Sequence, residues 1–436
     1  MLAVCGALLL VPGSPAAARG GGSPVARGGE SELVTRDQRR AIANALDWIA
    51  AAQQPGGYWG EEDGTKVADT ALSVLALMAG GNTVSAGRPI RAPDGTHRAD
   101  GPPQLRGPYA RQVLDGVRYL ARKAWEDDPN RVPGYIQDDK ISRMHGHGFA
   151  TLALAVASGN LGGRPVREIR DWLKPADGPD RDPSQLPLAD QVRWAVERAV
   201  RVTERAQDPD SGGWLYEPVP GGHEGSMTIT QIHALRAAQD AGIAVNGVVL
   251  RRAYQYVRDS QNLANPELHG GFAYTKTNKK RVSYSLTAAA LTTFFALGRY
   301  GDTPEDAQLI ADGMAFLDRR FEDALAARQW FYYGLFYGAQ ALYQEQDPRR
   351  MATQWPRLRD RILREQRADG SFSVLENDRS LEYSTAIATL HLQVPLETLP
   401  IFQRNRASSA TGLPAQPGFQ RNRASSATGL PAQPGF

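Results

Sequence analysis

The chain of 436 residues contains a single cysteine, Cys5. Cys5 lies in an N-terminal apolar run that we expect to be removed with a signal peptide, and the mature chain would then have no cysteine. Disulfide bonds, thiolate metal ligands and a catalytic cysteine are thereby excluded. A chain without such links depends on a large buried core, and about 400 residues are enough to build one.

An excess of charge of one sign is also missing from the body of the chain. There are 50 Lys+Arg against 47 Asp+Glu, and four of the arginines lie in the last 35 residues, which contain no acidic residue. The densest basic run is Lys279-Lys280-Arg281, which is typical of a solvated loop. Nucleic-acid binding needs many basic side chains on one face, so we exclude a nucleic-acid partner.

Long hydrophobic runs are absent as well. The longest apolar stretch near the start spans residues 1–11 and ends at Pro12, whereas a membrane-spanning helix needs about 20 residues. The stretch resembles the apolar region of a secretory signal, with small residues at 15–18 that offer a cleavage site. We therefore expect a signal peptide and flexible linker over residues 1–30, an exported protein, and no transmembrane helix.

Sustained alternation of apolar and polar residues does not occur either, so we expect almost no β-sheet. What the chain does contain is a repeat of one unit: an amphipathic helix, a turn with Gln followed by G-x-[W/F], and a helix rich in small residues. The four complete turns end at Trp59, Trp214, Phe272 and Phe372. Two further hairpins, around residues 113–157 and 304–344, have the helices without the full turn.

Six hairpins predict an all-α fold, an (α/α)6 toroid over residues 31–401 with an inner and an outer ring of helices. An open superhelix of stacked hairpins is the alternative. In the turns, we expect glycine to permit positive φ, the aromatic ring to pack on a neighbouring outer helix, and Gln to bond free amides at an inner-helix start. Two long connections, 80–107 and 160–187, are expected to be either binding loops or surface insertions.

The C-terminal segment differs in kind from the rest. Residues 402–418 read FQRNRASSATGLPAQPG, and residues 419–435 repeat these letters without change. A duplicated polar segment without an apolar face does not bury enough surface to order itself. We therefore predict a disordered tail over residues 402–436.

The Gln and G-x-[W/F] turns resemble the repeats of squalene and oxidosqualene cyclases and of protein prenyltransferase β-subunits. The run Met144-His145-Gly146-His147-Gly148-Phe149-Ala150-Thr151-Leu152 is similar to a group of exported bacterial proteins of this superfamily. The resemblance covers roughly residues 35–400, and it implies a toroid with a central cavity. It also implies a terpene cyclase-like enzyme or a binder of isoprenoids or other hydrophobic ligands.

Only part of the catalytic motifs of that superfamily occurs in this sequence. The cyclase motif D-x-D-D-T-A holds the acid that protonates an alkene, and the matching segment here is Lys66-Val67-Ala68-Asp69-Thr70-Ala71. The last acid is Asp69, and the central position is Ala68. The prenyltransferases bind zinc through Asp, Cys and His, and the mature chain has no cysteine to supply. We therefore expect neither a metal nor a cofactor.

The candidate site residues are polar and aromatic side chains near the starts of inner helices, where helix dipoles favour anions. His145 and His147 are two residues apart, and on a helix they point about 200° from each other. The stripe of Tyr333 and Tyr337 suits isoprenoid binding, sugar stacking or a packed core. The catalytic candidates are Asp69, His147, Glu224 and Glu382, and the ligand-binding candidates are His145, Tyr284, Tyr333 and Tyr337.

Two classes of function remain open from the sequence. The first is an exported enzyme that acts on a hydrophobic or a polysaccharide substrate. The second is a non-catalytic toroid that binds a small hydrophobic or glycan ligand or a protein partner. The two differ in whether the acidic and histidine candidates converge on one concavity.

Overall fold

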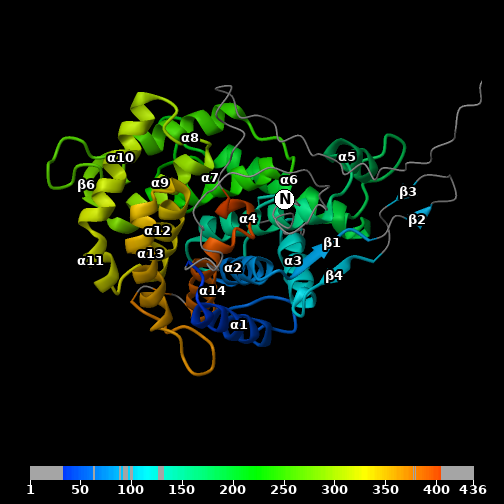
Figure 1. Cartoon of the computed structure of the whole chain (residues 1–436). Coiled ribbons are helices and arrows are strands. Elements are labelled where there is room, and N and C mark those ends of the chain that lie inside the picture. The colour runs from blue at the N-terminus through cyan, green and yellow to red at the C-terminus, as the bar shows by residue number, and fades with distance from the viewer. Residues whose placement is uncertain are drawn as a thin grey trace, which may run out of the picture.

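The computed structural model describes residues 33–61, 64–87, 90–91, 97–98, 102–125, 132–376, 378 and 380–403. Within them, six helical hairpins follow one another along the chain (Figure 1). The first helices of the hairpins are α1 (Arg36–Ala51), α3 (Ala110–Lys123), α6 (Leu188–Ala206), α8 (Gly247–Asp259), α10 (Pro304–Arg319) and α13 (Pro348–Leu363). The second helices are α2 (Lys66–Ala79), α4 (Arg143–Leu161), α7 (Gly225–Asp240), α9 (Tyr284–Ala296), α12 (Phe331–Glu345) and α14 (Leu381–Gln393).

The second helices form a closed inner ring. They pack on one another in the order α2, α4, α7, α9, α12 and α14, and α14 packs back on α2. The first helices form an outer layer, in which α1 contacts α14 and α2, α3 contacts α2 and α4, and α6 contacts α4 and α7. This closure confirms the all-α toroid and rules out the open superhelix.

Burial explains why each helix takes its layer. All 14 residues of α2 are buried, which suits a helix surrounded on every side by other helices. The buried residues of α1 instead recur along one stripe, including Ala41, Ala45 and Ile49, and its other face is polar. Such an amphipathic helix is stable only with one side against the ring and the other in water.

The glycine of the turn makes the same close contact in each complete hairpin, and the two turns that end in tryptophan add an indole hydrogen bond. The indole N–H of Trp214 donates to the carbonyl oxygen of Thr203 at 2.8 Å, and Trp214 is fully buried. Gly212 has φ +81°, and a Cβ on it would lie 2.5 Å from the carbonyl oxygen of Arg252 in α8. Glycine is therefore required where the turn meets the next outer helix.

The glutamine of the turn has a different role from the one expected. The side-chain amide of Gln207 donates to the carbonyl oxygens of Gly212 and Val249, both at 2.9 Å. Gln53 binds the carbonyl oxygens of Gly57 and Gln112 in the same way. The glutamine thus ties its turn to the next outer helix, and the prediction that it bonds amides at an inner-helix start was wrong.

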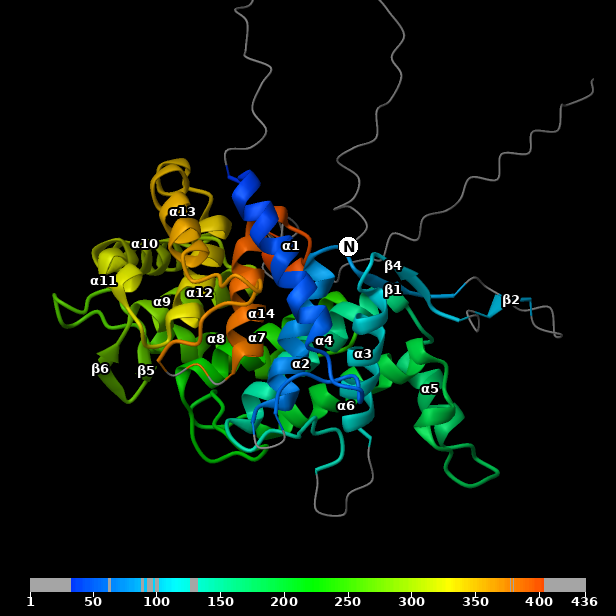
Figure 2. The ribbon, with the colours of Figure 1, turned by 90° about the horizontal axis from the view of Figure 1, so that it is seen from below.

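Strands are few and short in the described residues. Strand β1 (Thr83–Ser85) pairs with β4 (Gln104–Arg106), β2 (Ile90–Arg91) with β3 (His97–Arg98), and β5 (Ala273–Thr275) with β6 (Asn278–Val282), all antiparallel. The connection 160–187 holds the short helix α5 (Val166–Leu173) and the 3-10 turn η3 (Pro183–Gln185). Helix α5 packs on α6, and the first two strand pairs lie beside it on the same side of the molecule (Figure 2).

The C-terminal part of the described chain closes back on the ring. After η4 (Val394–Leu396), the turn η5 (Pro400–Phe402) contacts α7 and α12, and Phe402 is fully buried near Phe336. Phe402 therefore belongs to the toroid, although we expected the tail to begin there. Residues 404–436 of the expected tail and the expected signal peptide lie outside the described residues.

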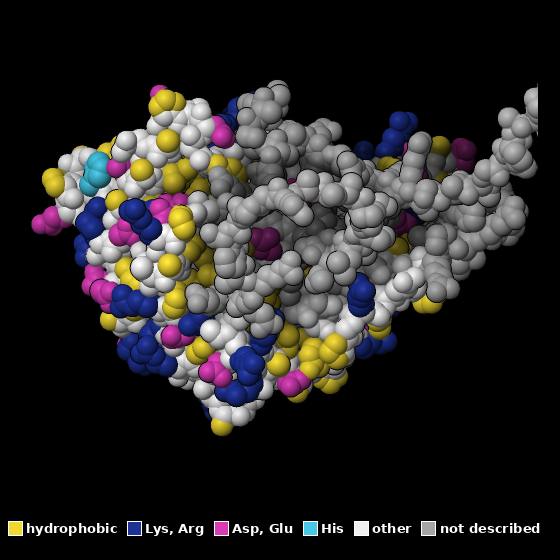
Figure 3. Space-filling model, in the orientation of Figure 1, with side chains coloured by type: hydrophobic (Ala, Val, Ile, Leu, Met, Phe, Trp, Pro, Cys, Tyr) yellow, Lys and Arg dark blue, Asp and Glu magenta, His cyan; other side chains and the backbone are white. Residues whose placement is uncertain are grey.

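The surface agrees with the charge balance of the sequence. Figure 3 shows basic and acidic side chains interspersed over the described part of one face. Lys279, Lys280 and Arg281 are exposed, as expected, but they lie in strand β6 and not in a loop. None of the helices described here is long and apolar enough to cross a membrane.

The turn aromatics should therefore act as structural residues. We expect Trp214→Ala to lower the free energy of unfolding by about 3–5 kcal/mol, because it leaves a large cavity and orphans the carbonyl of Thr203. Leu263→Ala, at a side chain that is 58% exposed, is the control and should change stability by less than about 0.5 kcal/mol. Urea denaturation measures both, and equal stabilities of the two variants would contradict the structural role.

Candidate functional site

A shared hydrogen bond sets the orientation of the inner helices at their N-terminal ends. In each complete hairpin the backbone N–H of the turn aromatic donates to a threonine hydroxyl in the following inner helix, at 2.9 to 3.1 Å. The four acceptors are Thr70, Thr228, Thr287 and Thr385, and all are buried. These threonines mark the outward side of the first turns of α2, α7, α9 and α14.

In α4 the same place is taken by His147. The backbone N–H of Ile136 donates to Nδ1 of His147 at 3.2 Å, and Nε2 lies 3.3 Å from the carbonyl oxygen of Ala199 in α6. Burial lowers the pKa of His147 to about 4, so the ring is neutral at neutral pH. The structure therefore places His147 between the turn and the outer helix, away from the other site candidates.

The residue two positions before each acceptor lies on the opposite, inward side of its helix, because two residues turn an α-helix by about 200°. These inward residues are Ala68, His145, Ser226, Ser285 and Tyr383, and we call them the rim. All but Ala68 are partly exposed, unlike the buried acceptors. His145 Nε2 lies 3.3 Å from Oγ of Ser226, which links α4 to α7.

The tyrosines of α12 extend the rim. The rings of Tyr333 and Tyr337 lie 4.7 Å apart, and the ring of Tyr337 lies 5.8 Å from His233 in α7. Burial raises the pKa of Tyr333 well above its usual value, and Tyr337, the carboxylate of Glu224 and Tyr383 add to the shift. Among the described residues, the buried hydroxyl of Tyr333 has no hydrogen-bond partner. Tyr333 therefore lies near groups of both α7 and α14.

A pair of buried acids flanks the first turn of α2. Asp69 is fully buried, and its Oδ2 accepts hydrogen bonds from the hydroxyls of Thr65 at 3.1 Å and Ser380 at 3.0 Å. Asp139 precedes α4, and its Oδ1 accepts the backbone N–H of Val67 at 2.6 Å. In the part of the chain that is described, Oδ1 of Asp69 and Oδ2 of Asp139 have no hydrogen-bond partner.

Burial dominates the electrostatics of this pair. It raises the pKa of Asp69 well above the usual 3.8, and the charges of Asp139 and Glu382 raise it further, against the two hydroxyl donors. Burial also raises the pKa of Asp139, to about 7, although the N–H groups of Val67 and Ala68 favour its ionised form. Burial therefore favours the protonated form of both acids, and Asp139 is partly ionised at neutral pH.

Two glycines make room for these acids. A Cβ on Gly146 would lie 1.9 Å from Oδ2 of Asp139, and a Cβ on Gly60 would lie 2.7 Å from Oδ2 of Asp69. The carboxyl group of Asp139 therefore lies directly against the backbone of α4, and that of Asp69 against the backbone at Gly60, between α1 and α2. This close approach is what removes them from water.

The other acidic candidates take different places. Glu224 is the N-cap of α7, where its carboxylate accepts the N–H groups of Ser226 at 2.9 Å and Met227 at 2.8 Å. Burial raises the pKa of Glu224, and these bonds oppose the shift. Glu382 lies in the first turn of α14 and is partly exposed, close enough to act on the charge of Asp69.

The sequence candidates are thus brought together only in part. Asp69 and Glu382 share one end of the α2–α14 contact, while His145, Tyr333 and Glu224 lie nearer α7. Tyr284 packs between α9 and α12, since a Cβ on Gly338 would lie 2.5 Å from its hydroxyl oxygen. Asp139 was missed, and the only signal for it was the Asp138-Asp139 pair just before an inner helix.

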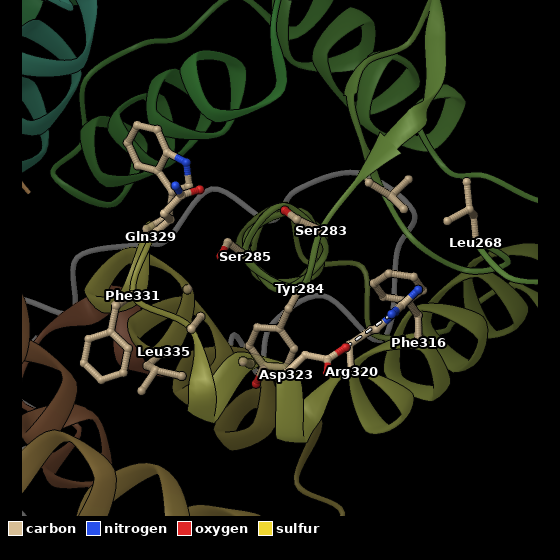
Figure 4. Close-up of a pocket in the computed structure, with 15 residues that line it drawn as sticks. Leu268, Ser283, Tyr284, Ser285, Phe316, Arg320, Asp323, Gln329, Phe331 and Leu335 are labelled. Carbon is tan, nitrogen blue, oxygen red and sulfur yellow. Dashed lines mark hydrogen bonds and ion pairs between the residues drawn. The ribbon is translucent and has the colours of Figure 1, made fainter. Parts of the chain in front are cut away.

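A pocket of about 390 Å³ lies beside the rim, at the starts of α9 and α12. Figure 4 shows Phe331 and Leu335 on one side of the start of α9, and Leu268 and Phe316 on the other. Within the described residues, no group of three or more His, Cys, Asp or Glu could hold a metal ion.

Comparisons with known proteins find a likeness in fold alone. No protein-family model and no curated protein matches the chain. Among solved structures, the apo type II terpene cyclase MstE from Scytonema is 14% identical over 83% of this chain and 100% of that chain, with a TM-score of 0.45. The ent-copalyl diphosphate synthase from Streptomyces platensis is 14% identical over 79% and 80% of the two chains, with a TM-score of 0.28. Arguments about activity therefore rest on the site itself.

The raised pKa of Asp139 predicts how stability depends on pH. Because the folded state holds this proton more tightly than the unfolded state, the stabilisation is complete below pH 3.8 and is lost as the pH rises to about 7. The loss amounts to about 1.4 kcal/mol per pH unit in this window. We expect Asp139→Asn, which keeps an acceptor for Val67, to make the slope shallower. Urea melts from pH 4.5 to 8 measure it, and an unchanged slope would contradict the assignment.

The close approach of Asp139 to Gly146 gives a second prediction. Gly146→Ala puts a methyl group on the Asp139 carboxylate, so either the cap on α2 or the start of α4 must shift. We expect a loss of about 1–3 kcal/mol in the free energy of unfolding. Gly247→Ala, at the start of α8, meets only the end of the flexible Arg251 side chain and serves as the control. A Gly146→Ala protein as stable as the control would disprove the close approach.

Proposed function

We propose that this chain is a terpene cyclase-like toroid that binds an isoprenoid at the rim and protonates it with Asp69. The observation that carries the proposal is a fully buried carboxyl group, whose pKa burial raises well above its usual value, with one oxygen that no described residue engages. Protonation of an alkene needs an acid of this kind, because water would otherwise take the proton.

In the proposed step the carboxyl O–H bond of Asp69 breaks and its proton forms a C–H bond with one alkene carbon, using the π electrons. The other carbon becomes a cation. The new Asp69 carboxylate keeps the hydrogen bonds from Thr65 and Ser380, which stabilise the ionised form. The carboxyl of Asp139, which accepts the N–H of Val67 in the first turn of α2, stabilises the positive charge that develops nearby when it is ionised.

The rim supplies the rest of what a carbocation requires. Tyr333, Tyr337 and Tyr383 offer π faces, to which a cation is attracted. His145 is neutral, because burial lowers its pKa to about 4, so it brings no opposing positive charge.

One observation favours a second candidate, an isoprenoid-binding toroid without catalysis. The inward position of α2 is Ala68, where the cyclase motif would have its central acid. Asp69 must then act from the adjacent position, facing Ser380. If it does not reach the ligand, the rim binds without conversion.

The test compares three isosteric variants with squalene, geranylgeraniol and geranylgeranyl diphosphate as substrates. We expect cyclised product from the wild type, and a loss of at least about 100-fold in Asp69→Asn, because a general acid contributes roughly that much. Asp139→Asn should lower the rate less. Gas chromatography with mass spectrometry, after dephosphorylation where needed, detects the products.

Asp138→Asn is the matched control, because Asp138 is the neighbour of Asp139 but binds the hydroxyl of Tyr119 and the ammonium of Lys123 instead. It should retain activity. Saturable binding without product in the wild type would support the second candidate. Neither binding nor product with any of the three compounds would overturn the proposal.

A further inference from the structure

The pocket beside the rim has features that the proposed reaction does not use. It is lined by the first residues of α9 and α12 and by the short helix α11 (Phe321–Ala326). Its wall combines the apolar side chains of Leu268, Phe316 and Leu335 with polar groups of Ser283 and Gln329. Its volume of about 390 Å³ falls within the range of small-molecule sites, roughly 300–1,000 Å³.

The residue that distinguishes this pocket is Trp330. It lies at the N-cap of α12 with φ +53°, in the left-handed region, which is unfavourable for a bulky side chain. Its side chain is 50% exposed, whereas Trp59, Trp214 and Trp355 are almost completely buried. Neither local backbone preference nor burial in the core accounts for a tryptophan here. Strained residues of this kind cluster at ligand sites.

The charges of the pocket cancel. Arg320 Nη1 lies 3.2 Å from Oδ2 of Asp323, and these are the charged side chains among its lining residues. The pair offers N–H donors and carboxylate acceptors side by side, and Gln329 and Ser283 add groups that both donate and accept. Such a set matches a neutral ligand that carries several hydroxyl groups better than it matches an anion or a hydrocarbon chain.

We propose that this pocket binds a saccharide. One face of the sugar ring, which presents C–H groups, stacks on the exposed indole of Trp330, and the hydroxyls bond to Asp323, Arg320 and Gln329. The assignment is independent of Asp69, which lies at the contact of α2 with α14, and of Asp139, which lies where α4 meets α2. It gives the toroid a carbohydrate-binding function beside its proposed chemistry.

The test uses glucose, galactose, mannose, N-acetylglucosamine, cellobiose and chitobiose as probes, with titration calorimetry and iodide quenching of tryptophan fluorescence. We expect at least one saccharide to bind saturably and to protect an exposed tryptophan from quenching. Trp330→Gly should raise the dissociation constant by roughly tenfold or more. Its melting temperature should be no lower than that of the wild type, because glycine relieves the left-handed backbone.

Two further variants separate binding from folding. Trp330→Phe keeps an aromatic face and should retain most of the affinity, and Asp323→Asn should weaken binding without removing the quenching signal of free Trp330. Asp69→Asn should bind saccharides as the wild type does. The saccharide proposal is therefore tested independently of the proposal that Asp69 is a catalytic acid. Absence of binding to every saccharide, or equal affinity in Trp330→Gly, would overturn it, as would binding of farnesol at this pocket in place of sugars.

Discussion

The hydrogen bond from the turn aromatic to the inner helix is the constraint on which the site depends. In α2, α7, α9 and α14 it holds Thr70, Thr228, Thr287 and Thr385 on the outward side, and in α4 the N–H of Ile136 holds His147 in the same way. The residues two positions earlier must then face the ring axis. A single backbone contact, repeated around the toroid, therefore decides which side chains form the rim and which are structural.

The same constraint separates the two histidines of α4. His147 accepts the N–H of Ile136 and is held against α6, while His145 faces inward and lies beside Ser226. On α2 the register turns Ala68 inward and leaves Asp69 toward Ser380, where burial raises the pKa of the acid well above its usual value. Asp69 is thus one residue away from the inward position, which Ala68 occupies. It lies close to Asp139, an acid that precedes α4.

Much of the fold could be predicted from the sequence, because helix periodicity and the G-x-[W/F] turns are local signals that repeat. The site was less predictable. Asp139 is 70 residues from Asp69, and only the packing of α4 on α2 brings it to the N–H of Val67. The role of Trp330 was equally hidden, since its left-handed backbone and its exposure depend on how α11 meets α12. A residue type at helical spacing does not reveal which contacts surround it.

The most direct test of the central claim is the protonation state of Asp69 in the folded protein. A ¹³C NMR titration of aspartate carboxyl carbons, with the Asp69 signal assigned by its loss in Asp69→Asn, measures the pKa of this group. We predict that the signal is still that of a neutral acid at pH 7, because burial raises the pKa of Asp69 well above its usual 3.8. A signal that titrates near pH 4 would show an ionised Asp69 and would contradict its role as the acid.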